Sequence, residues 1–321
     1  MRLLRGAACL AAAALLVCAC NQPASGSLKG VLVVYSPDLE QRMPEVLSRV
    51  QLYVTTVDPE AVFDFSTCTL EQLRGSLRER RTILFMVTSP EDLPGELGGA
   101  GPVLSARNVW ASGQSVFGVV VDGEGPPQAL SDSLLAAYNR HMHDYVYGSF
   151  VNTQMSSPAR MDSLRELGFV LDVPKSYRTE MWRPEDGVVQ YQRQDGEECL
   201  LMLTIRWLDT DRVLEEGEDA MAWRQSVARR FFYDAGADSV DRARTEAVPF
   251  PLGEHTGWKL TGVWRNPEYL NAGAFTSYII RVDGRRYLLD MEVYHPQEAK
   301  EPYLREGWTI MDTFVPDGED G

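Results

Sequence analysis

The pattern of hydrophobic and polar positions changes about halfway along the chain. In the first half, apolar runs such as Val31–Tyr35 and Thr82–Val87 are typical of buried strands. Apolar residues at helical spacing follow Pro44, and the capping box Thr69-Leu-Glu-Gln72 predicts a further helix that ends at Arg81. This alternation of strands and helices predicts an α/β-like mixed sheet with helices packed on it.

From about Pro158 onward the chain is richer in strands. Asp283-Gly284 separates two alternating apolar runs and is the strongest hairpin signal in the chain. Two amphipathic helices interrupt the strands, at Asp219–Phe232 and from Tyr303 to Met311. The second half therefore predicts a largely antiparallel sheet with flanking helices, which makes the whole chain α+β. The predicted strands are Phe169–Val173, Val188–Gln192, Cys199–Trp207, Gly257–Arg265, Phe275–Val282 and Tyr287–Tyr294.

The first twenty residues have the three parts of a secretory signal. Two arginines precede an apolar run over residues 7–17 that is too short to span a bilayer. The run ends in Val17-Cys18-Ala19-Cys20, which resembles a bacterial lipobox. We therefore predict that Cys20 is lipidated, with acyl chains such as palmitate holding the protein on a membrane. An ordinary cleaved signal with an incidental cysteine is the alternative.

These patterns divide the chain into four parts. Residues 1–19 are the predicted lipoprotein signal peptide, and residues 20–30 are a lipidated tether of small and polar residues. An α/β-like subdomain is predicted over residues 31–155, and an α+β subdomain with an antiparallel sheet over residues 156–321.

The charge balance excludes one large class of function. The chain of 321 residues carries 31 Lys and Arg against 46 Asp and Glu, a net charge of −15. That sign is wrong for a protein that holds nucleic acid electrostatically, so no nucleic-acid partner is predicted. Past residue 19, no apolar run reaches the length of about 18 residues that a membrane-spanning helix needs, which excludes a multispanning membrane protein.

Two cysteines remain once the signal peptide and the lipidation site are set aside. Cys68 and Cys199 lie in separate halves of the chain, each among apolar residues. We expect two unlinked, half-buried thiols, although an envelope location also permits a disulfide between them.

Strong catalytic signatures are absent from the sequence, which contains no GxSxG elbow, HExxH motif or P-loop. His141 and His143 lie two apart on a predicted helix, so their rings point about 200° apart and cannot share a metal ion. The acids between Asp209 and Asp219 lack the third oxygen ligand and the glycine of an EF-hand loop. His255 has no identifiable Ser or Cys partner. No metal site and no cofactor are predicted.

Five residues near strand ends are candidates for a ligand cleft: Trp110, Gln114, Trp264, Asn266 and Phe275. Aromatic rings beside small and amide side chains line many ligand sites. The alternative is that the large aromatic side chains cap a hydrophobic core and that Gly273 is present because the backbone there needs a residue without a Cβ atom.

Several of these residues belong to short motifs that follow one another in a fixed order. Beside the lipobox, they are Trp110-Ala111-x-x-Gln114, Leu167-Gly168-Phe169, Val173-Pro174-x-x-Tyr177, Gly262-x-Trp264, Gly273-x-Phe275 and a final Lys300…Leu304-Arg305 helix. The set resembles an uncharacterised lipoprotein family of the Bacteroidota and relatives, known as a domain of unknown function. The resemblance spans nearly the whole mature chain and implies an envelope location and a two-part architecture. It implies no activity.

The tether at residues 20–30 indicates which side of the membrane the folded part of the protein faces. In the resembled bacteria, lipoproteins sent to the cell surface usually carry acids close behind the lipidated cysteine. Here the first ionisable side chain after Cys20 is Lys29. We therefore expect a cell-envelope protein that is anchored in the outer membrane and faces the periplasm.

Two functions from different classes follow. The leading hypothesis is a membrane-tethered binding or scaffolding protein of unknown molecular activity, whose partners are the membrane, through the lipid anchor, and an unidentified envelope protein or cell-wall ligand. The alternative is an envelope hydrolase using a pair of carboxylates that the sequence does not identify.

Overall fold

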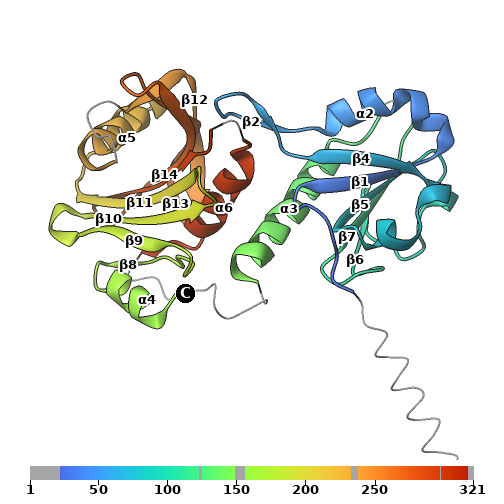
Figure 1. The fold of residues 1–321 in the computed structure, drawn as a ribbon, viewed down its shortest axis with the longest axis horizontal. Coiled ribbons are helices and arrows are strands. Elements are labelled where there is room, and N and C mark those ends of the chain that lie inside the picture. The colour runs from blue at the N-terminus through green and yellow to red at the C-terminus, as the bar shows by residue number, and fades with distance from the viewer. Residues whose placement is uncertain (1–21, 123–124, 149–155, 233–237, 297, 317–321) are drawn as a thin grey trace, which may run out of the picture. The chain divides into compact units, whose positions relative to one another are not determined.

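The computed structural model describes residues 22–122, 125–148, 156–232, 238–296 and 298–316 (Figure 1). The predicted signal peptide and Cys20 lie outside the described residues. The chain forms two compact units, described separately below. The N-terminal unit takes in the chain up to residue 51 and residues 63–138, and the C-terminal unit takes in residues 52–62 and the chain from residue 139 onward. The division falls inside a helix, whereas the sequence pattern predicted a change after residue 155.

A five-stranded sheet in the order β4-β1-β5-β7-β6 forms the N-terminal unit. Four of its five strands, β4, β1, β5 and β7, are parallel, and β6 is antiparallel to β7. The strand β5 is buried along its whole length, as its uninterrupted apolar run predicts. The predicted mixed sheet with helices is confirmed. The elements are β1 (Gly30–Tyr35), η1 (Pro37–Arg42), α2 (Met43–Val50), β4 (Asp64–Thr69), β5 (Thr82–Val87), η4 (Pro90–Asp92), β6 (Leu104–Arg107), β7 (Ser115–Val120) and the first half of α3 (Ala129–Tyr147).

The helix predicted after Thr69 is wrong in its length. The capping box between Thr69 and Gln72 is present, but it opens a single 3-10 turn, η2 (Leu70–Gln72). A second 3-10 helix, η3 (Gly75–Glu79), follows. Gly75 has φ +52°, in the left-handed region, so the backbone cannot continue as one α-helix through this point.

The C-terminal unit is built on a seven-stranded antiparallel sheet in the order β12-β13-β14-β15-β11-β10-β9. This confirms the antiparallel sheet with flanking helices. The elements are β2 (Tyr53–Val54), β3 (Glu60–Ala61), α4 (Pro158–Arg165), β8 (Phe169–Val170), β9 (Arg178–Arg183), η5 (Pro184–Asp186), β10 (Val188–Asp195), β11 (Cys199–Asp209), α5 (Gly217–Phe231), β12 (Ser239–Leu252), β13 (His255–Asn266), β14 (Asn271–Val282), β15 (Arg285–Tyr294), α6 (Glu301–Met311) and β16 (Val315–Pro316).

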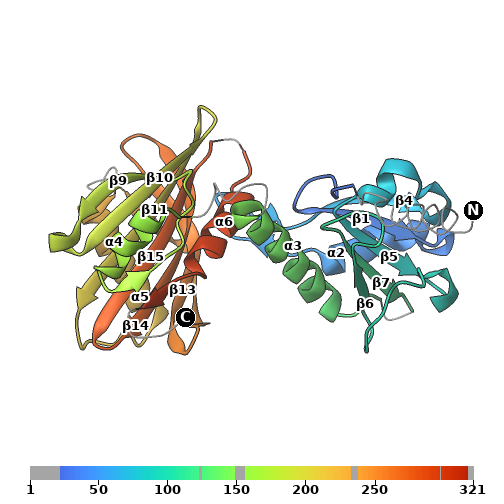
Figure 2. The same cartoon turned by 90° about the horizontal axis from the view of Figure 1, so that it is seen from below.

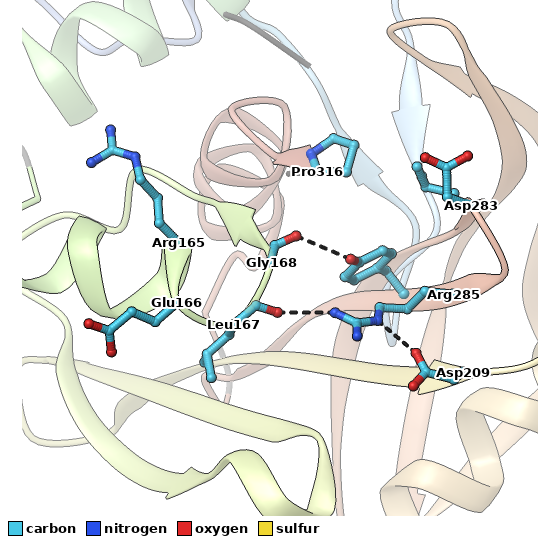
Figure 3. Close-up of a pocket in the computed structure, with 10 residues that line it drawn as sticks. Arg165, Glu166, Leu167, Gly168, Asp209, Asp283, Arg285 and Pro316 are labelled. Atoms are coloured by element: carbon cyan, nitrogen blue, oxygen red, sulfur yellow. Dashed lines mark hydrogen bonds and ion pairs between the residues drawn. The ribbon is translucent and has the colours of Figure 1, made fainter. Parts of the chain in front are cut away.

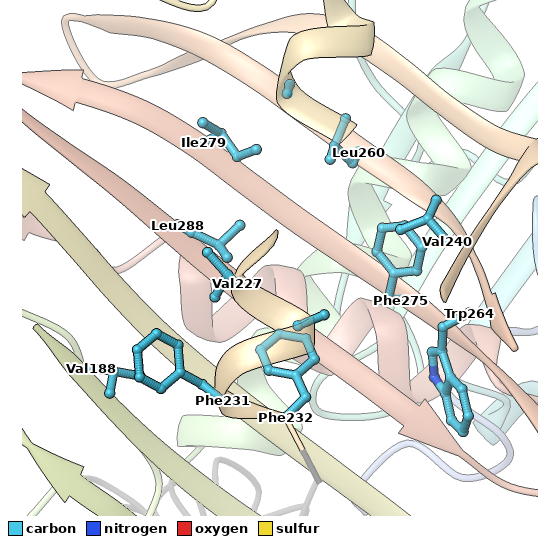
Figure 4. Close-up of a cluster of buried hydrophobic side chains, with 12 residues drawn as sticks. Val188, Val227, Phe231, Phe232, Val240, Leu260, Trp264, Phe275, Ile279 and Leu288 are labelled. Atoms are coloured by element: carbon cyan, nitrogen blue, oxygen red, sulfur yellow. The ribbon is translucent and has the colours of Figure 1, made fainter. Parts of the chain in front are cut away.

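Helices cover both faces of this sheet. On one face, Val227 and Phe231 of α5 pack on Phe275, Ile279 and other alternate residues of the strands (Figure 4). Side chains alternate between faces along a strand, so the neighbouring Thr276 points to the other face. There, the Trp308 indole of α6 donates a hydrogen bond to Thr276 Oγ1 at 2.6 Å. Figure 2 shows α6 against the strands. The helices α5 and α6 therefore cover opposite faces of the sheet.

The predicted hairpin at Asp283-Gly284 is confirmed. Both residues have positive φ, +48° and +79°, as a two-residue turn of the type I′ requires. The turn fixes the register of β14 and β15, in which Val282 lies opposite Arg285 and Arg281 opposite Arg286. That register places two arginines side by side at one end of the sheet.

Both cysteines beyond the signal are buried and free in the structure, Cys68 in β4 and Cys199 in β11. Within the described residues, every helix is too short or too polar to cross a bilayer.

Candidate functional site

Two of the five predicted cleft residues lie in the N-terminal unit, where they hold a loop in place. The buried Gln114 side chain accepts a hydrogen bond from the Trp110 backbone N–H at 3.0 Å. It also donates to the backbone oxygens of Arg78 and Arg80 at 2.7 Å each. The Trp110 ring packs on Phe85 and lies 5.8 Å from the Arg78 guanidinium. These contacts give Gln114 a full set of internal partners.

The other three lie together in the C-terminal unit. Trp264 and Phe275 belong to the core cluster beneath α5 (Figure 4). Asn266 is buried, donates to Asp238 Oδ1 at 2.9 Å, and accepts from two backbone N–H groups of the β13–β14 turn. The structure thus brings Trp264, Asn266 and Phe275 into one region, and a ligand cleft along them stays a prediction.

The histidines of α3 differ in their surroundings. His141 is buried, whereas the His143 side chain is 62% exposed. In the part of the chain that the structure describes, no group of three or more His, Cys, Asp or Glu side chains has the geometry to hold a metal ion.

A buried ion cluster lies between α5 and the sheet. The Arg224 guanidinium, 1% exposed, donates to Asp290 through Nε (2.6 Å) and Nη2 (3.1 Å). It also donates to Glu292 Oε1 at 2.8 Å and lies 3.4 Å from the centre of the Phe275 ring. Ser277 donates a further hydrogen bond to Asp290. Sequence analysis missed this cluster because nothing in the local pattern of α5 pairs Arg224 with a strand more than sixty residues away.

One guanidinium cannot neutralise both carboxylates of this cluster. Burial, with the nearby charge of Asp290, raises the pKa of Glu292 to about 8 against the opposing charge of Arg224. Glu292 therefore keeps its proton at pH 7. The two carboxyl groups are the kind of pair that a hydrolase would need, but both are already bonded to Arg224 and Asp290 is fully buried.

A polar pocket of about 410 Å³ lies between α4 and the β14–β15 turn (Figure 3). One of its two arginines, Arg285, donates to Asp209 Oδ1 at 2.8 Å and to the Leu167 backbone oxygen at 3.1 Å. The Tyr287 hydroxyl donates to the Gly168 backbone oxygen at 3.3 Å. Arg285 and Tyr287 thus bond to other groups that line the pocket, whereas Arg165 pairs with Asp162 outside it.

A second pocket, of about 260 Å³, lies at the same end of the sheet on the face that carries α5. We call it the arginine pocket. The loop before α5 covers it, held by a hydrogen bond from Trp258 Nε1 to the Leu214 backbone oxygen at 2.9 Å. It is lined by Arg212, Val213, Leu214, Pro249, Thr256, Gly257, Trp258, Ile279, Ile280, Arg281 and Arg286.

The arginine pocket gathers three positive charges in a chain of negative net charge. Arg281 and Arg286 are directly opposite each other on β14 and β15, an arrangement that destabilises a sheet when the charges are alike. Arg281 contacts the fully exposed Asp211 at 3.3 Å, and Arg212 lies 3.7 Å from Asp219. Both of these pairs are open to solvent, so they neutralise the pocket only weakly.

Arg286 is the residue that distinguishes this pocket. Its side chain is buried, with the residue 5% exposed, and stacks on the Trp223 ring of α5 at 5.0 Å. It donates to the Arg212 backbone oxygen, and no carboxylate of the described residues pairs with it. Burial lowers the pKa of Arg286, and the charges of Arg212 and Arg281 lower it further, while the charge of Asp219 partly opposes them. An arginine stays charged nevertheless, so this buried charge has no carboxylate of the described residues within ion-pairing distance.

The remaining wall of the pocket is apolar. Trp258 and Ile279 are cross-strand neighbours on β13 and β14, and Val213, 56% exposed, flanks the opening. At roughly 30 Å³ for each water, the volume corresponds to about nine water molecules. The chemistry fits an anionic group against the guanidinium groups with a short apolar portion against Trp258 and Ile279.

One sequence signal could have found this site. The two-residue turn at Asp283-Gly284 already implies that Arg281 and Arg286 face each other across the hairpin. Arg212 carries no comparable signal, because it reaches the pocket from a loop.

One known family matches part of the chain. The family described as "Domain of unknown function (DUF4837)" matches residues 156–313, which covers the arginine pocket and most of the C-terminal unit. No match is found among curated proteins.

Among solved structures the likenesses are weak. Cyanobacterial PsbP (CyanoP) from Synechocystis sp. PCC 6803 is 12% identical over 53% of this chain and 96% of its own, with a TM-score of 0.36. LpqN of Mycobacterium tuberculosis, involved in cell envelope biogenesis, is 13% identical over 54% of this chain and 96% of its own, with a TM-score of 0.30. The Pseudomonas aeruginosa protein PA94, a putative regulator of unknown function, is 14% identical over 46% and 92%, with a TM-score of 0.30. Scores this low carry no argument about function.

Proposed function

We propose that this protein is a lipid-anchored binding protein of the bacterial cell envelope, and that its C-terminal unit binds a small anion with an apolar portion in the arginine pocket. The lipobox at Val17-Cys18-Ala19-Cys20 supports the anchor. The uncharged tether that follows supports a position on the outer membrane facing the periplasm.

The observation that carries the binding proposal is Arg286. A buried charge without a partner costs free energy unless something neutralises it. Arg281 and Arg212 add to that cost, because their charges repel Arg286. Bound anions relieve such a cluster, and a guanidinium fork matches a carboxylate or phosphate oxygen pair.

The apolar wall selects among anions. A free inorganic anion would leave Trp258 and Ile279 against water, whereas an anion with a short hydrocarbon or ring portion covers them. The volume of about 260 Å³ suits a ligand of this size rather than a complete membrane lipid. The ligand class is therefore a short-chain carboxylate or phosphate ester.

Calorimetric titration with three eight-carbon probes tests the proposal: octanoate, octanol and octyltrimethylammonium. Octanoate should bind, and the neutral and cationic probes should bind at least tenfold more weakly, because a charge-assisted hydrogen bond contributes about 1.5–3 kcal/mol. Equal binding of the three probes, or no binding of octanoate, would contradict the proposal.

A matched pair of variants separates the pocket from overall charge. Arg286→Gln should weaken octanoate binding at least tenfold. Arg165→Gln removes the same charge from an exposed side chain on α4 and should leave the affinity within about twofold. If both variants weaken binding equally, long-range charge rather than the pocket is responsible.

The hydrolase alternative now has named carboxylates but little support. Asp290 and Glu292 both bond to Arg224, and neither is free to take part in proton transfer to a substrate. We therefore do not propose hydrolysis.

A further inference from the structure

The arginine pocket holds more positive charge than one carboxylate can neutralise. Arg212, Arg281 and Arg286 all line it. Among the described residues, Asp211 pairs with Arg281, and Asp219 lies 3.7 Å from Arg212. Asp211 is fully exposed and the Asp219 side chain is 43% exposed, so water screens both pairs. A ligand with a single negative charge would therefore leave two guanidinium charges balanced only by these screened pairs.

The positions of Arg281 and Arg286 allow both to contact one ligand group. They are directly opposite each other on β14 and β15, so their side chains leave the sheet on the same face. Opposite positions in an antiparallel pair of strands have Cβ atoms about 4.5–5.5 Å apart. Both residues line the cavity. This spacing lets the two guanidinium groups bind different oxygens of one anionic group.

Both guanidinium groups keep hydrogen-bond donors for a ligand. Arg286 donates through Nη2 to the Arg212 backbone oxygen, and no other hydrogen bond joins its guanidinium to a described residue. Arg281 donates through Nε to the Thr210 backbone oxygen and through Nη2 to Asp211, each at 3.3 Å. A guanidinium has five N–H donors, so each of the two has donors that no described group of the protein uses.

We propose that the ligand of the arginine pocket is a phosphate monoester, whose phosphate binds between Arg281 and Arg286. This inference rests on the proposed function and narrows its ligand class. A phosphate monoester carries about two negative charges and has three terminal oxygens that accept hydrogen bonds, whereas a carboxylate has one charge and two oxygens. The second charge and the third oxygen give Arg281 a partner while Arg286 keeps its own. The organic portion of the ester covers Trp258 and Ile279.

Three eight-carbon anions separate the charge of the head group from its shape: octyl phosphate, octyl sulfate and octanoate. The sulfate head is tetrahedral and has three terminal oxygens, as the phosphate has, but it carries only one charge. In calorimetric titrations of the full mature chain at pH 8, where the phosphate is a dianion, octyl phosphate should bind at least tenfold more tightly than either of the others. Equal affinities for octyl phosphate and octyl sulfate overturn the proposal.

Inorganic phosphate distinguishes the ester from the free ion. It has the charge of the phosphate head but leaves Trp258 and Ile279 against water, so it should bind at least tenfold more weakly than octyl phosphate. Binding of inorganic phosphate as tight as that of octyl phosphate would assign the pocket to the free ion and overturn the ester.

Arg281→Gln tests the second anchor of the phosphate. The substitution removes one of two like charges that face each other across the strands, so the variant should fold at least as stably as the natural protein, which urea unfolding checks. Octyl phosphate should bind the variant at least tenfold more weakly, whereas the affinity for octanoate, held by Arg286, should change less than about threefold. Arg165→Gln, outside the arginine pocket, should keep the preference for octyl phosphate. A preference that survives Arg281→Gln, or an equal loss for both probes, overturns the assignment of the phosphate to this pair of arginines.

The result for octanoate separates a failure of this inference from a failure of the proposed function. Octanoate binding that Arg286→Gln weakens, together with no preference for octyl phosphate, contradicts the phosphate monoester and leaves the proposed function standing. If none of the anions binds, the arginine pocket is not a ligand site and the proposed function fails with the inference.

Discussion

The side chain of Glu60 caps the helix that begins at Glu301. Its Oε2 accepts hydrogen bonds from the backbone N–H groups of Lys300 and Glu301, each at 2.8 Å. The helix α6 has no cap from the side chain of Lys300 itself. A residue from the short hairpin of β2 and β3 therefore satisfies the orphan donors of a helix some 240 positions later, and its charge is favourable at the positive helix end.

Glu60→Ala should destabilise the C-terminal unit by about 1–2 kcal/mol, because two backbone donors lose their partner. Urea unfolding followed by circular dichroism measures the change. Asp58→Ala in the same hairpin removes an equal charge from an exposed side chain and should cost less than about 0.5 kcal/mol. Equal losses in the two variants would show that the cap contributes nothing specific.

The buried carboxyl of Glu292 predicts a pH dependence of stability. Its folded-state pKa of about 8 is above the ordinary 4.5, so its contribution is fully present below about pH 4.5 and is lost as the pH rises through 8. The free energy of unfolding should therefore fall between pH 5 and pH 9.

Glu292→Gln imitates the protonated form and isolates this group from the other buried acids. The variant should be more stable than the natural protein by about 1–3 kcal/mol at pH 9, with the difference shrinking towards pH 5. Urea titrations across this range measure both proteins. A constant difference at all pH values would mean that Glu292 is ionised throughout.

The sequence predicts elements well where the signal is local. The turn at Asp283-Gly284 needs positive φ at two adjacent positions, and the residue pair that provides it most readily is visible in the sequence. The prediction of a helix after Thr69 failed because the deciding feature is not visible in the residue pattern. Its leucine spacing is helical, but Gly75 takes a left-handed conformation that the spacing does not reveal.

The strand β12 shows a second limit of prediction from sequence. Its run of charges with Pro249 and Pro251 does not resemble a strand, yet β12 lies at the edge of the sheet, where a missing N–H donor is tolerated.

The arginine pocket was also predictable only in part. Arg281 and Arg286 could be paired from the hairpin, but burial of Arg286 depends on Trp223 and on the loop before α5, and no local pattern links these segments.

If Cys20 is lipidated, a single substitution should change where the protein is found in the cell envelope. Cys20→Ala should move the protein from the membrane to the soluble fraction of the envelope, because the acyl chains are its only predicted anchor. Fractionation with immunodetection measures this. If the Cys20→Ala protein still sediments with membranes, the lipobox interpretation fails.

The side of the membrane is a separate prediction. Protease added to intact cells should leave the protein whole and degrade it only once the outer membrane is made permeable. Degradation in intact cells would place the body on the cell surface.

The binding of an anion in the arginine pocket is tested most directly by locating a ligand. A crystal structure with 8-bromooctanoate, in which the anomalous signal of bromine marks the end of the chain, shows where and in which direction the molecule binds. The account predicts the carboxylate within hydrogen-bonding distance of the Arg286 guanidinium and the hydrocarbon chain against Trp258 and Ile279. A carboxylate bound instead by Arg285 in the neighbouring polar pocket, or a ligand with its bromine end at Arg286, would contradict it.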